Sequence, residues 1–111
     1  VHAPTKRRTA GRPFVLSEYG GYSWNIKDHV WNHARSFGYI MFPNSAALSK
    51  AYAKLHKKQI IPLIKKGLCA TVYTQVSDVE FEVNGIYSYD REVLKLDRET
   101  VIEVNRNLTF R

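Results

Sequence analysis

The chain has 111 residues, 44% of them hydrophobic and 24% charged, and a formal net charge of +7. This length allows one small domain but excludes a complete eight-stranded α/β barrel, which needs about 250 residues. The composition is that of a globular protein, and no apolar run approaches the roughly 18 residues that span a membrane. The one cysteine, Cys69, excludes an internal disulfide, and its neighbours predict a buried strand thiol, compatible with a reducing, cytoplasmic compartment.

The first part of the chain is predicted to be a lead-in, a strand and a long loop. Residues 1–12 are charged and polar, without apolar periodicity or a secretory signal, and are expected to be exposed. The apolar run that follows predicts a buried strand over residues 13–18. Gly20 and Gly21 then predict a hinged loop. The stretch 22–44 is aromatic and irregular, and loops of this length are usually functional or carry short helices of their own.

The middle of the chain predicts one long helix over residues 45–66. Ser45 is a suitable N-cap, the apolar residues are spaced for one helix face, and Gly67 follows as the expected stop. Pro62 lies inside this segment, where it removes a hydrogen bond and clashes with the preceding turn. We therefore expect a kink or a break near residues 58–61.

The last part repeats the pattern of strand, loop and helix. Residues 69–75 are rich in β-formers and predict a strand, and Asp97 is the expected N-cap of a helix over 97–108. Alternating strands and helices imply parallel pairing, with both long loops at the carboxyl ends of the strands. Two parallel strands alone leave open edges, so the pattern implies an architecture larger than this chain.

Glu18 is the strongest candidate for chemistry, because it is a carboxylate at the carboxyl end of a predicted strand. The glycines after it would let a substrate approach the backbone closely. By position alone, a glutamate at a strand end is more often solvated or ion-paired than a nucleophile. Position therefore does not decide its role.

Residues of the two long loops could bind a sugar. Trp24, Trp31 and Tyr22 could stack on a sugar ring or form a small core of their own, and Trp24 is favoured because it lies nearest the candidate carboxylate. Asp78 and Glu80 could accept paired hydrogen bonds from a diol, or cap loops and form ion pairs.

Two segments resemble the family 2 glycoside hydrolases, which include β-galactosidases and β-glucuronidases. Residues 14–22, with Ser-Glu-Tyr-Gly at their centre, are similar to the nucleophile segment on the seventh barrel strand. Residues 70–91, which begin Ala-Thr-Val-Tyr-Thr-Gln-Val-Ser-Asp, are similar to the eighth strand and the loop after it. The matches occur in the right order with one predicted helix between them, and the resemblance covers about residues 13–107.

The resemblance implies an α/β fold in which residues 13–111 are the last two βα units, the C-terminal quarter, of a (β/α)8 barrel. It implies a retaining O-glycoside hydrolase with a carbohydrate substrate, in which Glu18 is the nucleophile. The family's acid/base glutamate follows an Asn on the fourth strand, and no Asn-Glu pair occurs in this chain. We therefore expect the isolated chain to be inactive without the rest of the barrel. The expected substrate-binding residues are Tyr19, Trp24, Gln75, Asp78 and Glu80.

Other interpretations stay open beside this one. His29 and His33 have the i, i+4 spacing of a helical metal pair, but no Glu lies between them and no third ligand is in register, so no metal or cofactor is expected. A carbohydrate-binding module, a nucleic-acid-binding module and an assembly domain that pairs its strand edges with another copy are the alternatives. Nucleic-acid binding is not expected, because basic clusters are usually solvated faces or complement a helix dipole. These clusters are Lys6, Arg7 and Arg8, and Lys57, Lys58, Lys65 and Lys66.

Overall fold

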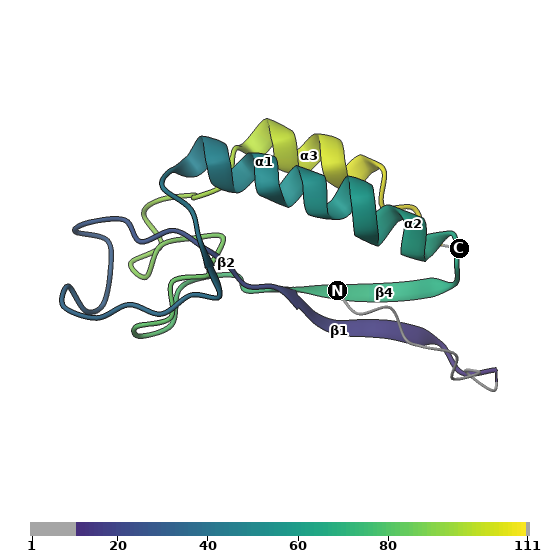
Figure 1. Ribbon diagram of the computed structural model, residues 1–111, viewed down its shortest axis with the longest axis horizontal. Helices are drawn as coiled ribbons and strands as arrows, with labels where there is room; N and C mark the ends of the chain where they lie inside the picture. The colour runs from purple at the N-terminus through teal and green to yellow at the C-terminus, as the bar shows by residue number, and fades with distance from the viewer. Residues whose placement is uncertain (1–10, 111) are drawn as a thin grey trace.

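The computed structural model describes residues 11–110, and Figure 1 shows their arrangement. The predicted order of strand, loop, helix, strand, loop and helix is present, with two short strands added inside the first loop. Of the predicted lead-in 1–12, the first ten residues lie outside the described part of the chain. The elements are β1 (Phe14–Gly20), β2 (Tyr22–Ser23), β3 (Ile40–Met41), α1 (Ser45–Leu55), the π-helical turn η1 (His56–Ile60), α2 (Ile61–Ile64), β4 (Leu68–Thr74) and α3 (Arg98–Arg106).

The two long strands, β1 and β4, lie side by side and run parallel. Phe14 pairs with Leu68 at one end and Gly20 with Thr74 at the other. β1 begins one residue later and ends two residues later than its predicted strand, and β4 lies one residue earlier. Because the strands run in the same direction, the loops that follow them leave from the same edge. The class is therefore a small mixed α/β fold with parallel strands.

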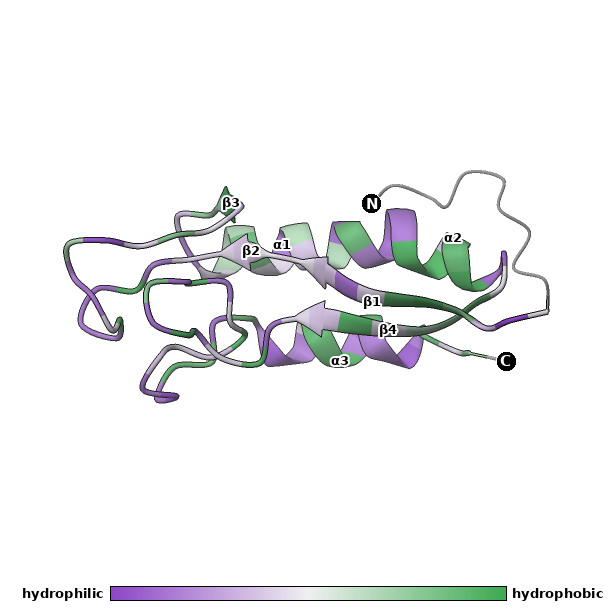
Figure 2. Cartoon of the chain, turned by 90° about the horizontal axis from the view of Figure 1, so that it is seen from below, coloured by the Kyte–Doolittle hydropathy of each residue, from purple (hydrophilic) through white to green (hydrophobic). Residues whose placement is uncertain are grey.

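The helices cover one face of the β1–β4 pair and leave the other face open within the described chain (Figure 1). Tyr19 and Leu68 are buried on the helix side. On the opposite face Val15 is 46% and Val72 is 56% exposed. Figure 2 looks onto this open face and shows hydrophobic residues along both strands. The prediction of fully buried strands is therefore wrong for residues 11–110, because only one face has a partner layer.

Cys69 is exposed, so the prediction of a buried thiol is also wrong. The register of the two strands shifts between Phe14 and Val15, and this leaves Cys69 without a partner in β1. Its Sγ donates a weak hydrogen bond to the carbonyl of Gly67 at 3.3 Å. Leu68 points into the core, so its neighbour Cys69 points to the opposite face, which has no partner layer within residues 11–110.

The predicted helix 45–66 is interrupted by a π-helical turn. η1 begins directly after α1, and α2 then carries Pro62 in its first turn. Proline has no N–H and its ring excludes the carbonyl four residues earlier, so a wider turn before it accommodates the ring. α2 ends at Ile64, two residues before the predicted end, and Gly67 with a φ of 102° terminates the segment.

Side chains of one asparagine and one aspartate cap the two long helices. The N-cap of α1 is Asn44, whose Oδ1 accepts a hydrogen bond from the N–H of Ala47 at 2.9 Å. The prediction of Ser45 was wrong by one position, because Ser45 is already the first helical residue. Asp97 caps α3 as predicted and accepts from the N–H of Thr100 at 2.8 Å.

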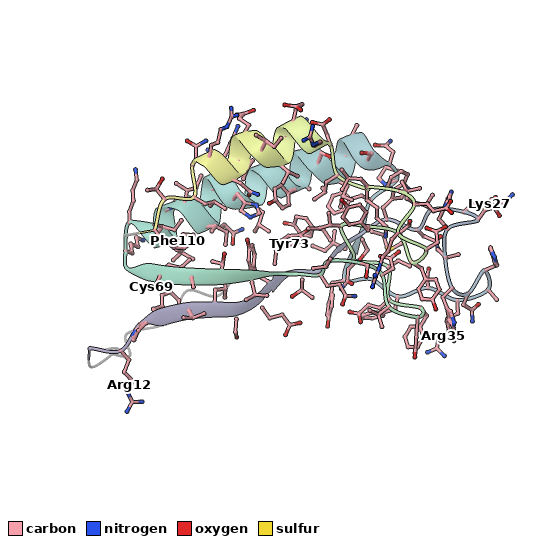
Figure 3. The ribbon with its side chains drawn as sticks, turned by 180° about the vertical axis from the view of Figure 1, so that it is seen from behind. Arg12, Lys27, Arg35, Cys69, Tyr73 and Phe110 are labelled. Carbon is pink, nitrogen blue, oxygen red and sulfur yellow. The ribbon has the colours of Figure 1, made fainter. Side chains whose placement is uncertain are left out.

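A second buried cluster joins α1 to α3 and complements the cluster between the strands and the helices. Its buried members are Leu48, Tyr52, Leu96 and Val104. Burial of a side chain such as Leu48 stabilises the fold by about 1.5–3 kcal/mol. Tyr73 contacts both clusters, and Figure 3 shows it between β4 and the helices. Both clusters therefore lie on the helix side of the strand pair.

Candidate active site

Glu18 lies near the carboxyl end of β1, with its side chain exposed. It lines a shallow hollow of about 180 Å³ at the edge where β1 and β4 both end. The backbone N–H of Gly21 donates to the carbonyl of Thr74 at 3.2 Å and holds the two strand ends together. The hollow is formed by Glu18, Tyr19, Gly20, Gly21, Tyr39 and Thr74.

Two glycines shape this hollow, and each is required by its conformation and its surroundings. Gly20 has a φ of 105° and Gly21 a φ of 66°. Residues with a Cβ rarely adopt such positive φ angles. A Cβ at Gly20 would meet the Tyr73 ring at 2.5 Å, and one at Gly21 would meet the Tyr39 ring at 2.8 Å. Aromatic rings therefore pack directly on the backbone beside Glu18.

Tyr39 belongs to the hollow but was not predicted from the sequence. Its side chain is 67% exposed, although the ring is packed against Gly21 and makes an edge contact with Phe37 at 5.2 Å between ring centroids. The parallel pairing of β2 with β3 brings Tyr39 there. Strands of two residues carry no alternation that a sequence could reveal, so no local signal marks this tyrosine.

Tyr19 follows Glu18 in the chain but points to the opposite side of the strand, into the core. Its hydroxyl lies 2.8 Å from Nε2 of His56, and burial raises the pKa of the hydroxyl above its usual value. Direct contact of Tyr19 with a substrate through this hydroxyl would require breaking the bond to His56.

Asp78 forms a buried ion pair with Lys95, a residue that the sequence did not single out. Nζ of Lys95 lies 2.6 Å from each carboxylate oxygen, and the side chains are 0% and 1% exposed for Lys95 and Asp78. The same Nζ donates to the carbonyls of Trp24 at 2.9 Å and Val83 at 3.1 Å. Burial raises the pKa of Asp78 and lowers the pKa of Lys95, while their mutual hydrogen bonds oppose both shifts.

Lys95 links the loop after β1 to the loop after β4, because its Nζ bonds both the carbonyl of Trp24 and the carboxylate of Asp78. Asp78 also accepts from the N–H of Gly85 at 2.8 Å, so both of its oxygens are engaged inside the protein. A sugar hydroxyl could reach Asp78 only by displacing these donors. Of the two roles considered for Asp78, the structure places it in the ion pair.

The remaining predicted site residues lie in the two loops but do not line the hollow. Trp24 is half-buried and packs against the α1–α3 cluster. Gln75 follows β4 through a cis peptide bond, and its Nε2 donates to Oδ1 of Asn84 at 2.6 Å. Glu80 is exposed. The structure therefore brings Glu18 together with Tyr39 and the glycines, and not with Trp24, Gln75 or Glu80.

His29 and His33 lie on a loop rather than on a helix, so their spacing does not place them on one face. His29 instead lies near Asp90 and Glu92, and their ligand atoms are all within 4.8 Å of one another. Nδ1 of His29 is 2.7 Å from Oδ2 of Asp90, which joins the two long loops. Hydrogen bonds from Ser88 and from the N–H of Glu92, with a smaller contribution from His29, lower the pKa of Asp90 to about 2.

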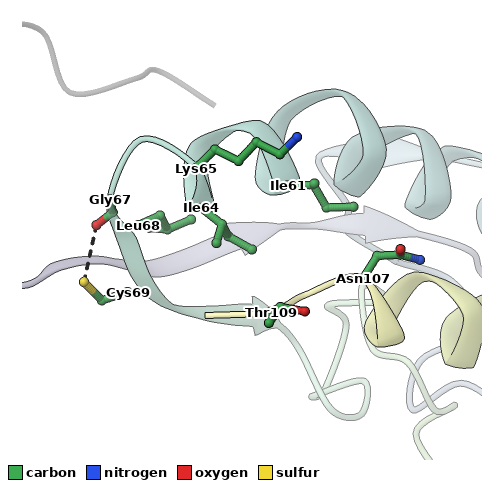
Figure 4. Close-up of a pocket in the computed structure, with 8 residues that line it drawn as sticks. All are labelled: Ile61, Ile64, Lys65, Gly67, Leu68, Cys69, Asn107 and Thr109. Atoms are coloured by element: carbon green, nitrogen blue, oxygen red, sulfur yellow. Dashed lines mark hydrogen bonds between the residues drawn. The ribbon is translucent and has the colours of Figure 1, made fainter. Parts of the chain in front are cut away.

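A larger cavity, of about 690 Å³, lies at the opposite end of the strands (Figure 4). Its lining is mostly apolar and includes the exposed Cys69 and the stem of Lys65.

Of the basic residues on the helices, Lys57 is ion-paired with Glu103 at 3.0 Å. No helix within residues 11–110 is long and apolar enough to cross a membrane.

The fold and the site define a small α/β protein with an exposed carboxylate where two parallel strands end. Comparison of the chain with protein-family models and with curated protein sequences found no match. The resemblance to family 2 glycoside hydrolases therefore depends on the two sequence segments described above.

Proposed function

We propose that the chain is the C-terminal quarter of a (β/α)8-barrel glycoside hydrolase of the family 2 type, and that Glu18 is its nucleophile. The observation that carries the proposal is the position of Glu18, an exposed carboxylate in a hollow where two parallel strands end. Active sites of (β/α)8 barrels occupy that edge. The proposed reaction is hydrolysis of a β-linked O-glycoside without a cofactor.

The one-sided helix layer supports a barrel over an open α/β sheet. Helices cover both faces of a doubly wound sheet, but they cover only the outer face of a barrel. The open face of this strand pair carries Val15 and Val72, branched residues of the kind that fill barrel interiors. Within the described residues β1 and β4 pair only with each other, so each has a free edge for a further strand.

The proposed chemistry needs two carboxyl groups. Glu18 attacks the anomeric carbon and forms a glycosyl ester while the glycosidic C–O bond breaks. A carboxylic acid about 5 to 5.5 Å away protonates the leaving oxygen, then takes a proton from the water that hydrolyses the ester. Glu18 is the only carboxylate lining its hollow among residues 11–110. We therefore expect the acid to come from other strands of the parent enzyme. Its absence should lower the hydrolysis rate of the isolated chain by about 10²- to 10⁴-fold.

Tyr39 adds a sugar-binding surface to this proposal. An exposed aromatic ring is a suitable platform for the apolar face of a sugar, and its hydroxyl supplies a polar contact. The ring packs against Gly21 on one side and makes an edge contact with Phe37. Glu80, which is exposed in the loop after β4, stays a prediction as an acceptor for sugar hydroxyls.

Covalent trapping tests the proposed nucleophile directly. The full-length gene product is incubated with a panel of 2-deoxy-2-fluoro glycosyl reagents, and the peptides are analysed by mass spectrometry. We expect one adduct on the peptide that contains Glu18, and none in the Glu18→Gln variant. Glu99→Gln is the matched control, because it removes an exposed carboxylate on α3, outside the hollow. If folded wild-type protein forms no adduct with any sugar, the proposal is wrong.

The exposed aromatic residues favour one alternative, a carbohydrate-binding module without catalysis. Trp31, Phe37 and Tyr39 are 49%, 44% and 67% exposed. This alternative predicts saturable sugar binding that is equal in wild type and in Glu18→Gln, with no covalent adduct. Calorimetric titration of both proteins with the sugars of the trapping panel distinguishes it from the enzyme.

A further inference from the structure

A histidine is buried directly behind the strand that carries Glu18. His56 opens the π-helical turn η1 and is fully buried. Its Nδ1 lies 2.9 Å from the carbonyl oxygen of Tyr52, and its Nε2 lies 2.8 Å from the hydroxyl of Tyr19. Both ring nitrogens are therefore engaged inside the core.

These partners determine where the proton of the imidazole lies. A carbonyl oxygen can only accept, so Nδ1 of His56 carries the hydrogen and donates to Tyr52. In the neutral ring Nε2 is then an acceptor, and the hydroxyl of Tyr19 donates to it. Burial lowers the pKa of His56, which favours this neutral form. The hydrogen bond thus has one direction, from the strand to the helix.

The strand ladder is irregular at the residue that the proposed reaction uses. Leu16 and Tyr19 have partners in β4, but the register shifts between them, so Glu18 lies outside the regular pairing. After Tyr19 the chain passes through Gly20 and Gly21, both with positive φ. The ladder therefore does not fix the direction of the Glu18 side chain. Its neighbour Tyr19, in contrast, is anchored by a side-chain hydrogen bond to His56.

We propose that His56 is a positioning residue for Glu18, acting through the hydrogen bond that it accepts from Tyr19. Successive side chains of a strand point to opposite faces, so a Tyr19 side chain held in the helix layer turns Glu18 toward the open hollow. The π-helical turn has a role in this arrangement, because it places a histidine where the helix faces β1. This inference rests on the proposed function of Glu18 as a nucleophile.

The test measures covalent trapping in the full-length enzyme, with the rate constant at saturating reagent separated from the concentration that gives half-saturation. Tyr19→Phe keeps the ring and removes only the hydroxyl. His56→Leu removes the acceptor, and His56→Gln offers an amide oxygen in its place. We expect Tyr19→Phe and His56→Leu each to lower the rate constant by about 10- to 100-fold with half-saturation unchanged, because small misplacements of reacting groups have effects of this size.

If His56 positions Glu18 through its hydrogen bond with Tyr19, two further results follow. The double variant should be no slower than the slower single variant, and His56→Gln should recover part of the rate. Tyr52→Phe is the matched control, because it removes the hydrogen bond from Tyr52 on α1 to Asn105 on α3 and leaves Tyr19 untouched. Thermal melting of each variant checks that it is folded.

The inference is overturned if Tyr19→Phe is trapped at the wild-type rate, or if Tyr52→Phe slows trapping as much as Tyr19→Phe. A lower melting temperature with an unchanged rate also overturns it, because the bond would then serve stability alone. Failure of the proposed function gives a different result, in which wild-type protein is not trapped on Glu18 at all, and the inference then falls with it.

Discussion

Replacing Lys95 by methionine should destabilise the protein strongly, although Lys95 lies in a loop. Its ammonium group faces both oxygens of Asp78 at 2.6 Å in a site with 0% and 1% exposed side chains. Methionine fills a similar volume but leaves the carboxylate buried without its counter-charge. Breaking a buried ion pair in this way costs about 3–5 kcal/mol. The carbonyl of Trp24 also loses its donor.

The measurement is the free energy of unfolding in urea for Lys95→Met and for a matched control. Lys57→Met breaks the pair with Glu103, whose side chains are 52% and 68% exposed, and should change stability by only about 0–1 kcal/mol. Adding Asp78→Asn to Lys95→Met removes the unpaired charge and should restore part of the loss. A loss below about 1 kcal/mol for Lys95→Met, or no recovery in the double variant, would refute the reasoning.

Two further predictions concern Tyr39 and His56. Tyr39→Ala in the full-length enzyme should raise KM about 2- to 10-fold with little change in kcat, because an aromatic contact contributes about 0.5–1.5 kcal/mol. Trp31→Ala, which lies outside the hollow, should leave KM unchanged. The folded pKa of His56 lies below its unfolded value of 6.5, so its contribution to stability is complete above that pH and is lost as the pH falls toward the folded pKa. Urea unfolding from pH 8 to pH 5 should show this loss, with a slope of at most about 1.36 kcal/mol per pH unit, and the loss should be smaller in His56→Leu. The hydroxyl groups around His56 do not ionise in this range, because burial raises the pKa of Tyr19 and of Tyr73 and raises that of Tyr52 to about 12.

Local signals in the sequence predicted the elements well. The cap at Asp97, the stop at Gly67 and the disturbance before Pro62 each depend on a few adjacent residues, and the structure has all three. The errors at Ser45 and Cys69 both depend on how the chain packs. Periodicity alone does not encode which of two adjacent residues caps the helix, or which face of a strand lacks a partner layer.

The candidate site was predicted in part. The position of Glu18 at the end of a strand follows from the order of the elements, and the structure places it there. The partner of Asp78 could not be predicted, because Lys95 is 17 residues away and approaches it only after the second loop has folded. The role of His56 could not be predicted either. A buried histidine is recognised only by the hydrogen-bond partners of its two ring nitrogens, and these are known only from the structure.

The open face of the β1–β4 pair has a consequence for how this polypeptide behaves during synthesis. Within residues 11–110 the parallel strands have bare edges and exposed valines, which are a template for pairing with an extended segment, including one from another chain. Such a surface has to be covered soon after it forms. We therefore expect aggregation to compete with folding for this part of the molecule, and to increase with protein concentration more steeply than folding does.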